Sequence, residues 1–272
     1  MKIVVDTLGS DLGSSEIKKA IVAFLNKNTD VEVIAVGNEA ELKEISDKCE
    51  IIHAPDIVPM EAGPLEVMRM RNSSMFVAIN EMKNRGADAV ISAGSTGGFL
   101  SAATLSLKTS TNVKRAALIA PFPTKIKGKK VVILDIGASN ENSPEELSQF
   151  AIMGSEYVKA VFGINNPKIY LLSNGTEEGK GSPTGKQAFN FLKNNPNFKG
   201  NIEARNVLSG EADVIVTDGF TGNVLLKSIE GTAKMMSGMI KNIFKKNLWT
   251  KLGYLHVRKG VKDMSETMDY KS

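Results

Sequence analysis

Short apolar runs alternate with longer amphipathic segments along most of the chain. Many of the runs are rich in β-branched residues, and helical spacing of apolar positions often follows them. Strands that alternate with helices in this way are typical of an α/β protein with a mostly parallel sheet. The runs expected to form strands are residues 2–6, 31–36, 50–53, 88–91, 116–120, 130–134, 168–172, 202–207 and 213–217.

Capping residues and prolines predict where several elements begin and end. Ser14 or Ser15 is expected to cap the first helix, and Ser143 the helix that begins at residue 144. Pro121 and Pro123 are expected to break the strand at 116–120, because proline has no N–H for the ladder. The segments expected to form helices are residues 14–27, 39–47, 64–70, 73–84, 99–107, 144–162 and 187–192.

Polar, glycine-containing loops follow four of the predicted strands. Their sequences are Ser92-Ala-Gly-Ser-Thr-Gly-Gly98, Asp135-Ile-Gly-Ala-Ser-Asn140, Ser173-Asn-Gly-Thr-Glu-Glu-Gly-Lys-Gly181 and Asp218-Gly-Phe-Thr-Gly-Asn223. Open α/β sheets place ligands at the carboxyl ends of their strands, and glycine lets backbone N–H groups approach an anionic ligand closely. Thr221 or Asn223 is the expected N-cap of the helix after the last loop. No loop alone matches a phosphate-binding signature, so each alone also fits an ordinary turn between strand and helix.

Charged side chains near these loops add candidate ligands for an anion. Arg69 and Arg71 lie just before Ser73 and Ser74, and guanidinium groups beside hydroxyls could hold a phosphate. Solvated helix termini are an equal alternative for both arginines. Lys180, on the glycine-rich loop after residues 168–172, is a further candidate.

The composition narrows the chemistry. The 272 residues are 42% hydrophobic and 24% charged, which suits one α/β domain over residues 1–272, with a helical extension expected near 232–268. The single cysteine, Cys49, and two histidines show no metal-ligand spacing, which disfavours zinc hydrolysis and Ser-His-Asp catalysis. A net charge of +4 and 6% aromatic residues give no reason to expect nucleic acid as a partner.

No signal for secretion or membrane insertion is visible. The chain has no run of about 18 apolar residues. No charged segment followed by an apolar one begins at Met1. We therefore expect a cytoplasmic protein.

Residues 232–249 combine apolar positions with lysines. The apolar positions recur at helical spacing and are Met235, Met236, Met239, Ile240, Ile243 and Phe244. Such a helix fits contact with a membrane surface, and it equally fits packing in the core or against a partner subunit.

A series of motifs occurs in an order that matches one known family. The motifs include Val5-Asp6 with Gly9 and Asp11, Ser73-Ser74-Met75, Ser92-Ala-Gly94 with Thr96-Gly97, Leu134-Asp135 with Gly137-Ala138, Glu177-Glu-Gly-Lys-Gly181 and Asp218-Gly-Phe-Thr-Gly-Asn-Val224. Over essentially its whole length the chain resembles the phosphate acyltransferases, which make acyl phosphate from an acyl carrier protein thioester and inorganic phosphate. The resemblance implies a three-layer α/β/α fold with a mostly parallel sheet, related to isocitrate dehydrogenase and phosphotransacetylase. It also implies a homodimer and a place at the start of phospholipid synthesis.

The chain departs from the family pattern at a few positions. Ser95 and Ser139 stand where the family usually has Asn, and Ala116 replaces a usual Pro. The sequence stops at Ser272, where family members continue through a Gly-rich segment, so we expect a C-terminally shortened member.

In the implied reaction, phosphate itself is the nucleophile, so no metal or cofactor is expected. Lys180 is expected to hold phosphate or the developing oxyanion, and Asn223 to donate its amide to the carbonyl oxygen. The residues expected to bind substrate are Arg69, Ser73, Ser92, Gly94, Thr96, Gly97, Asp135, Gly137, Asp218, Thr221 and Gly222.

Two other functions stay open on the sequence alone, and a third is disfavoured. One is a phosphotransacetylase-like transfer between acyl-coenzyme A and phosphate. Another is a non-catalytic or weakly active membrane-associated scaffold of lipid synthesis. A nicotinamide dehydrogenase of the same fold is disfavoured, because the sequence lacks a metal-binding carboxylate cluster.

Overall fold

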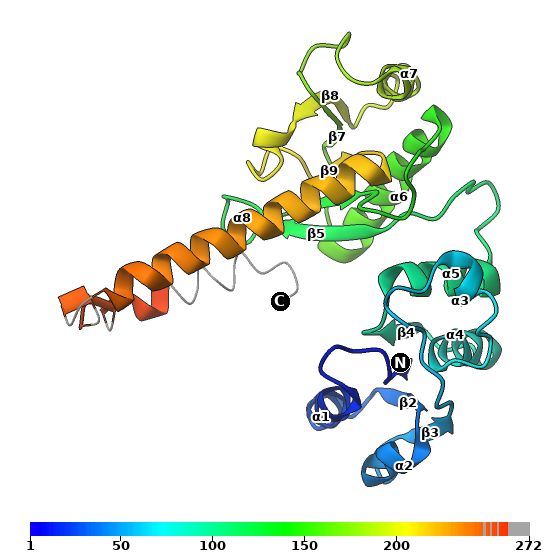
Figure 1. Cartoon of the computed structure of the whole chain (residues 1–272). Coiled ribbons are helices and arrows are strands. Elements are labelled where there is room, and N and C mark those ends of the chain that lie inside the picture. Colours follow the sequence, from blue (N-terminus) through cyan, green and yellow to red (C-terminus); the bar gives the residue numbers. More distant parts are fainter. Residues whose placement is uncertain (247–248, 251, 255, 261–272) are drawn as a thin grey trace. The chain divides into compact units, whose positions relative to one another are not determined.

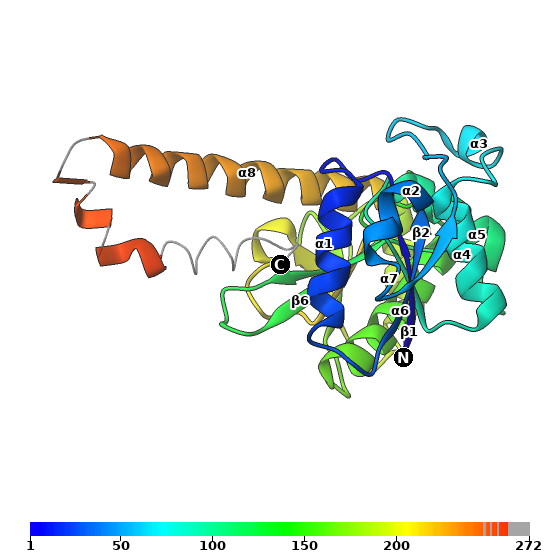
Figure 2. The same ribbon diagram turned by 90° about the horizontal axis from the view of Figure 1, so that it is seen from below.

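The chain forms two compact units, one over Met1–Asn112 and one that begins at Val113 (Figures 1 and 2). The computed structural model describes residues 1–246, 249–250, 252–254 and 256–260. Each unit has its own sheet and hydrophobic core. One domain over residues 1–272 stays a prediction, because compactness alone does not decide whether a unit folds independently.

The first unit is a parallel sheet with the strand order β3-β2-β1-β4. Each crossover between neighbouring strands contains a helix, as parallel pairing requires. Its elements are β1 (Lys2–Asp6), α1 (Ser14–Leu25), β2 (Glu32–Gly37), α2 (Glu39–Leu42), the 3₁₀ helix η1 (Lys43–Ile45), β3 (Glu50–His53), α3 (Pro64–Val67), α4 (Ser74–Arg85), β4 (Ala89–Ser92) and α5 (Thr96–Leu107).

Helices cover both faces of this sheet, since successive side chains of a strand point to opposite faces. Ile3 and Val5 of β1 pack in a cluster with Ile21 of α1. Val4, between them, packs in another cluster with Ala78 of α4. The two inner strands, β1 and β2, are therefore buried from both sides, which explains their apolar sequences.

The second unit has the strand order β5-β6-β9-β7-β8, with only the β5–β6 pair antiparallel. The predicted α/β class with mostly parallel strands is confirmed, in two sheets. The elements are β5 (Ile119–Pro123), β6 (Lys130–Leu134), α6 (Pro144–Phe162), β7 (Ile169–Ser173), α7 (Pro183–Leu192), β8 (Phe198–Glu203), the 3₁₀ helix η2 (Ala204–Asn206), β9 (Val214–Val216) and α8 (Gly219–Lys245).

Helices also cover both faces of the second sheet. Phe150 of α6 packs with Leu134 on one face, and Leu226 of α8 packs with Ile133 and Ile215 on the other. Ser143 forms the predicted cap of α6 and completes a capping box with Glu146. This local signal explains why the sequence predicted the bounds of α6 correctly.

Some local predictions are wrong. The strand expected at 202–207 is β8, which ends at Glu203 and is followed by η2. Ser14 and Ser15 lie inside α1, whose N-cap is Gly13. Pro121 and Pro123 lie within β5 rather than ending it. β5 is the edge strand, so the missing N–H groups fall on positions that face away from β6 and cost no ladder bond.

The helix expected at 232–249 is the second half of a longer helix, α8, that starts at Gly219. Its buried residues, Gly219, Gly222 and Leu226, all lie in the first two turns. The second half runs beyond the sheet of its own unit (Figure 2). None of the described helices is both long and apolar enough to cross a bilayer. The part of the expected extension at 261–268 lies outside the described residues.

Gly154 and Gly231 make a matched pair for testing helix packing. A Cβ on Gly154 in α6 would lie 2.6 Å from Val214 Cγ1, whereas a Cβ on Gly231 in α8 would meet nothing within 4 Å. Gly231→Ala should therefore raise the free energy of unfolding by about 0.5–1 kcal/mol through helix propensity. Gly154→Ala should lower it by about 1–2 kcal/mol, since overpacking outweighs the same gain. Urea unfolding of both variants would measure this difference, and equal shifts would contradict the close packing of α6 on β9.

Candidate active site

The candidate residues form two groups at the carboxyl ends of parallel strands, one group in each unit. In the first unit the loops after β1 and β4 follow neighbouring strands. In the second, the loops after β6, β9 and β7 follow consecutive neighbours in the sheet. The topology therefore brings the loops of each group together at one sheet edge.

Asp6 is the centre of the first group. It lies opposite Ser92 at the ends of β1 and β4, and Ser92 Oγ donates a hydrogen bond to Asp6 Oδ2 at 2.6 Å. Leu8 N donates to Asp6 Oδ1 at 3.2 Å. Burial raises the pKa of this carboxyl, and hydrogen bonds from the Ser74 and Ser92 hydroxyls oppose the rise. Asp6 thus joins β1, β4 and the start of α4.

Glycines let the two loops of this group touch. Gly9 has a φ of +80°, and a Cβ there would lie 3.1 Å from the Cα of Gly94. Ser95 caps α5 by accepting a bond from Gly98 N at 3.2 Å. The helix therefore begins at Thr96, so Thr96 and Gly97 lie in its first turn and not in the loop. Both residues are exposed.

Ser73 is the N-cap of α4, but its side chain makes no capping bond. It is 1% exposed, and its Oγ has no hydrogen-bond partner among the described residues. Arg69 and Arg71 are exposed and have no ion-pair partner in the described part of the chain. The structure thus brings Ser73 and Ser92 into one group through Ser74 and Asp6, and records no bond from either arginine to it.

Asp135 organises the loop after β6, and the peptide bond before it is cis. The side chain is fully buried. Its Oδ1 accepts bonds from Leu118 N at 3.1 Å, Gly137 N at 3.0 Å and Ala138 N at 2.8 Å. Its Oδ2 accepts from the N and Oγ of Ser139, both at 3.1 Å. These donors fix the backbone of the loop, and a substrate contact of Asp135 stays a prediction.

Asp218 is the N-cap of α8, so the expected cap at Thr221 or Asn223 is wrong. Its two carboxylate oxygens accept from Thr221 N and Thr221 Oγ1, each at 2.8 Å. An ionised side chain at the N-cap also interacts favourably with the helix dipole, which explains the earlier start. Thr221 and Asn223 therefore lie in the helix, and both are exposed.

The first turn of α8 packs directly on the loop after β6. A Cβ on Gly219 would overlap Ser139 O, and a Cβ on Gly222 would overlap Asp135 O. A Cβ on Gly137, whose φ is +135°, would lie 3.5 Å from Cβ and Cγ of Asn223. Six predicted site residues thus come together here: Asp135, Gly137, Asp218, Thr221, Gly222 and Asn223.

Lys180 lies on the loop after β7, the strand beside β9. Asn174 Oδ1 accepts from Gly181 N at 2.9 Å, and Glu177 O accepts from Lys180 N at 3.0 Å and from Asn201 Nδ2 at 2.8 Å. The loop is therefore held in place while the Lys180 side chain is exposed. Among the described residues, no hydrogen bond joins Lys180 to Asn223.

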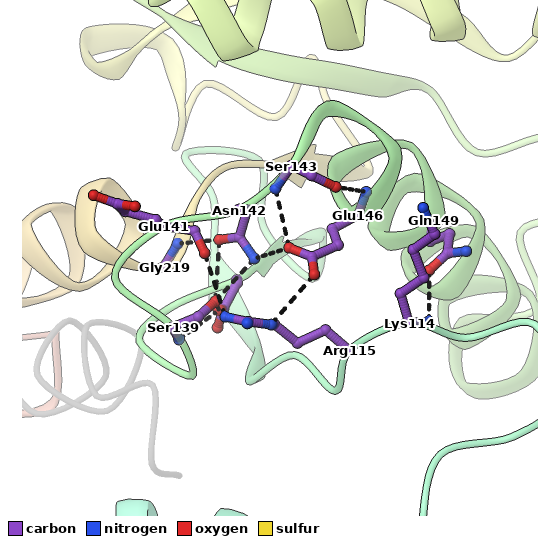
Figure 3. A network of polar contacts seen from close by, with 10 residues as sticks. Lys114, Arg115, Ser139, Glu141, Asn142, Ser143, Glu146, Gln149 and Gly219 are labelled. Carbon is purple, nitrogen blue, oxygen red and sulfur yellow. Dashed lines mark hydrogen bonds and ion pairs between the residues drawn. The ribbon is translucent and has the colours of Figure 1, made fainter.

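A polar network that joins the start of α6 to the first residue of α8 was not predicted from the sequence (Figure 3). Arg115 Nε pairs with Glu146 Oε1 at 3.3 Å, and Asn142 Nδ2 donates to Glu146 Oε2 at 3.2 Å. Asn142 Oδ1 accepts from Gly219 N at 3.2 Å. The capping box at Ser143 marks one end of this network in the sequence, but nothing local marks Arg115 or Gly219 as its partners.

Within the described ranges, no group of three or more His, Cys, Asp or Glu side chains is arranged to hold a metal ion. The candidate ligands are instead hydroxyls, amides, backbone N–H groups and the side chains of Lys180 and Arg69. Such groups are suited to an anionic, oxygen-rich substrate.

A family model described as "Fatty acid synthesis protein" matches residues 1–272. A phosphate acyltransferase of a Nitratiruptor species is 36% identical over 275 residues, which cover 99% of this chain and 82% of the relative. A phosphate acyltransferase of Lactococcus lactis subsp. cremoris is 40% identical over 277 residues, covering 98% of this chain and 83% of the relative. The chain belongs to the phosphate acyltransferase family.

Solved structures share the fold of this phosphate acyltransferase family member. A phosphotransacetylase from Streptococcus pyogenes matches with a TM-score of 0.62 at 19% identity, over 86% of this chain and 82% of that chain. A branched-chain phosphotransacylase from Enterococcus faecalis matches with a TM-score of 0.57 at 16% identity, over 85% of this chain and 84% of that chain. The predicted phosphotransacetylase-like α/β fold is therefore confirmed.

Asp6→Asn tests the buried carboxyl of the first group. Because burial raises the pKa of Asp6, the folded state binds this proton more tightly than the unfolded state. Its contribution to stability is therefore full below the ordinary Asp pKa and is lost as pH rises through the raised pKa. Asn removes this titration and still offers an oxygen to Leu8 N. The wild type should lose stability relative to the variant across that window, as measured by urea unfolding at several pH values. Parallel pH profiles would contradict the assignment.

Proposed function

We propose that this protein transfers a fatty acyl group from acyl carrier protein to inorganic phosphate, giving acyl phosphate for phospholipid synthesis. The observation that carries this proposal is the match of nearly the whole chain to relatives named phosphate acyltransferase. The residues of the two candidate groups support it, because each group includes hydroxyl, amide or backbone N–H donors that suit anionic oxygen.

The proposed reaction needs positioning and charge stabilisation more than covalent help from the protein. A phosphate oxygen attacks the thioester carbonyl carbon, the carbon–sulfur bond breaks, and the leaving thiolate takes up a proton. The protein must hold phosphate near the carbonyl and donate hydrogen bonds to the oxyanion that forms. Neither task requires a serine, cysteine or histidine nucleophile.

In the second unit, Asn223 would donate its side-chain amide to the carbonyl oxygen, and Lys180 would carry positive charge to the phosphate or oxyanion. The geometry supports both roles, since Asn223 is exposed beside Gly137 at the N-terminal end of a 27-residue helix. The helix dipole favours negative charge at this end. Lys180 extends from an ordered loop at the same edge of the sheet.

In the first unit, the loop after β4 and the start of α5 would hold phosphate. Thr96 would supply its hydroxyl, and Thr96 and Gly97 their backbone N–H groups. Ser92 and Gly94 would shape the loop, since Gly94 N donates to Ser92 Oγ at 3.1 Å and Ser92 Oγ donates to Asp6. The buried Ser73 hydroxyl supports an oxygen ligand at this place, because it has no partner among the described residues and a buried unpaired hydroxyl is costly. Arg69, exposed four residues earlier, would add the positive charge that such a ligand needs.

Purified protein with acyl carrier protein thioester and phosphate tests the function directly, with acyl phosphate trapped by hydroxylamine as the readout. A parallel reaction with acyl-coenzyme A separates the proposal from a phosphotransacetylase-like transfer. We expect acyl phosphate to form only with the acyl carrier protein thioester, or far faster with it than with acyl-coenzyme A. Faster reaction with coenzyme A would replace the proposal, and no product with either thioester would favour the scaffold.

Lys180→Ala and Asn223→Ala should each lower kcat/KM by at least about 10²-fold, since each removes a contact made to developing charge. Both side chains are exposed, so the melting temperature should stay near that of the wild type. Lys186→Ala, which removes an exposed lysine from α7, is the matched control and should keep wild-type rates. A variant with unchanged kcat/KM would exclude its residue from the mechanism.

The second half of α8 is the proposed contact with an anionic membrane surface, for a homodimeric protein that is otherwise cytoplasmic. Met235, Met236, Met239 and Ile243 are exposed, and the exposed lysines around them are Lys234, Lys241, Lys245 and Lys246. Phe244 is half-buried and lies with its ring centroid 5.2 Å from that of Tyr254. An amphipathic helix with a lysine-rich rim is suited to this surface, and a partner subunit is the alternative.

Flotation with vesicles that contain anionic lipid tests this contact. We expect wild-type protein to float, and Met239→Asp with Ile243→Asp to abolish flotation, because charges on the apolar face oppose insertion. Phe244 is left unchanged, so that the packing against Tyr254 is kept. Light scattering of the same variants measures the dimer. Loss of the dimer with no flotation of the wild type would assign this face to the partner subunit.

A further inference from the structure

Asn142 is the junction of the polar network in Figure 3. Its Oδ1 accepts from Gly219 N at 3.2 Å. Its Nδ2 donates to Glu146 Oε2 at 3.2 Å and to Ser139 Oγ at 2.9 Å. One side chain therefore joins three segments: the loop after β6, the capping box of α6 and the first residue of α8.

The partners of Asn142 fix which atom of its amide is oxygen. A backbone N–H at Gly219 can only donate, so it must face the oxygen. The Glu146 carboxylate already accepts from Ser143 N at 3.0 Å and pairs with Arg115, so it must face the amino group. Aspartate has the same shape but would place one carboxylate against another. Position 142 thus requires an amide and not merely a polar side chain.

Gly219 is the point through which Asn142 can act on the candidate site. The first turn of α8 lies against the backbone of residues 135–139 with no space for a Cβ at Gly219 or Gly222. These contacts limit how closely the helix approaches the loop, but they do not fix how the helix is oriented along it. The hydrogen bond from Gly219 N to Asn142 Oδ1 fixes this orientation, because hydrogen bonds are directional. Asn223 lies one turn further along the same helix.

We propose that Asn142 is a positioning residue that orients the first turn of α8, and with it the amide of Asn223, for the acyl transfer. This proposal rests on the proposed function. Arg115 and Glu146 hold the Asn142 amide in the required orientation, and Gly219 transmits it to the helix. The hydrogen bonds of Asn142 go to Gly219, Ser139 and Glu146, so its proposed role needs no contact with the substrate.

Asn142→Asp is the decisive variant, and Asn140→Asp is its matched control. Asn140 is exposed on the same loop and gains the same charge without facing Glu146. We expect kcat of Asn142→Asp to fall about 10²-fold, as for a catalytic group displaced by about 1 Å. KM for phosphate should change by less than about threefold, because the displaced group acts on the transition state. Asn140→Asp should keep the wild-type kcat.

Glu146→Gln supplies a rescue that a general loss of structure would not show. The glutamine amide that this substitution introduces can donate to the new carboxylate. The loss of kcat caused by Asn142→Asp should therefore be at least about tenfold smaller in the Glu146→Gln background, a coupling expected only between neighbours. Asn142→Ala removes the same bonds without adding charge. Its loss of kcat should be unaffected by Glu146→Gln.

Amide hydrogen exchange over residues 218–223 provides a readout that does not depend on activity. Exchange there should be at least about tenfold faster in Asn142→Asp than in Asn140→Asp, with the rest of α6 unchanged. If the wild type makes no acyl phosphate, the proposed function fails. Hydrogen exchange still tests whether the bond from Gly219 N to Asn142 Oδ1 stabilises the first turn of α8. If the wild type is active and folded Asn142→Asp and Asn142→Ala both keep their kcat, the positioning role is overturned. An equal loss of kcat for Asn142→Asp in both Glu146 backgrounds would also overturn it.

Discussion

The close approach of α8 to the loop after β6 is the constraint on which the second unit depends. Backbone meets backbone there, because a Cβ on Gly219 or Gly222 would overlap the carbonyl oxygens of Ser139 and Asp135. Such an approach leaves little water between the segments, so every polar group in the contact needs a protein partner. Asp135, Asn142 and Asp218 provide these partners. The glycines permit the contact, and the three polar side chains make it specific.

The two units use a buried aspartate at the carboxyl end of a central strand in different ways. Asp135 receives five hydrogen bonds, mostly from the backbone of its own loop, and so defines that loop. Asp6 receives its bonds from Leu8 N and from the hydroxyls of Ser74 and Ser92, while burial raises its pKa. Hydroxyls can rotate and exchange partners, whereas backbone N–H groups are fixed. The hydrogen bonds of Asp6 are therefore less fixed in direction than those of Asp135.

The elements predicted well from the sequence are those set by local signals. The capping box at Ser143 fixed one end of α6, and apolar runs fixed β1 and β6. The start of α8 was placed too late, since Asp218 and Thr221 compete as caps and only the structure shows which side chain accepts. The Arg115–Glu146 pair was not predicted, because its members lie far apart in sequence and meet only when β5 and α6 pack. The family motifs located the loops, but not the partners that hold them.

The two prolines in β5 have a consequence for the protein before it is fully folded. β5 forms an outer edge of the second unit's sheet, and an exposed edge with free N–H groups can recruit a strand from another chain. Pro121 and Pro123 lie at alternate positions, so two of the donors that would face outward are missing. The chain can therefore complete this sheet with fewer N–H groups free to pair with a strand of another chain. By lacking these two N–H groups, β5 is less prone to aggregate with other chains while the protein folds.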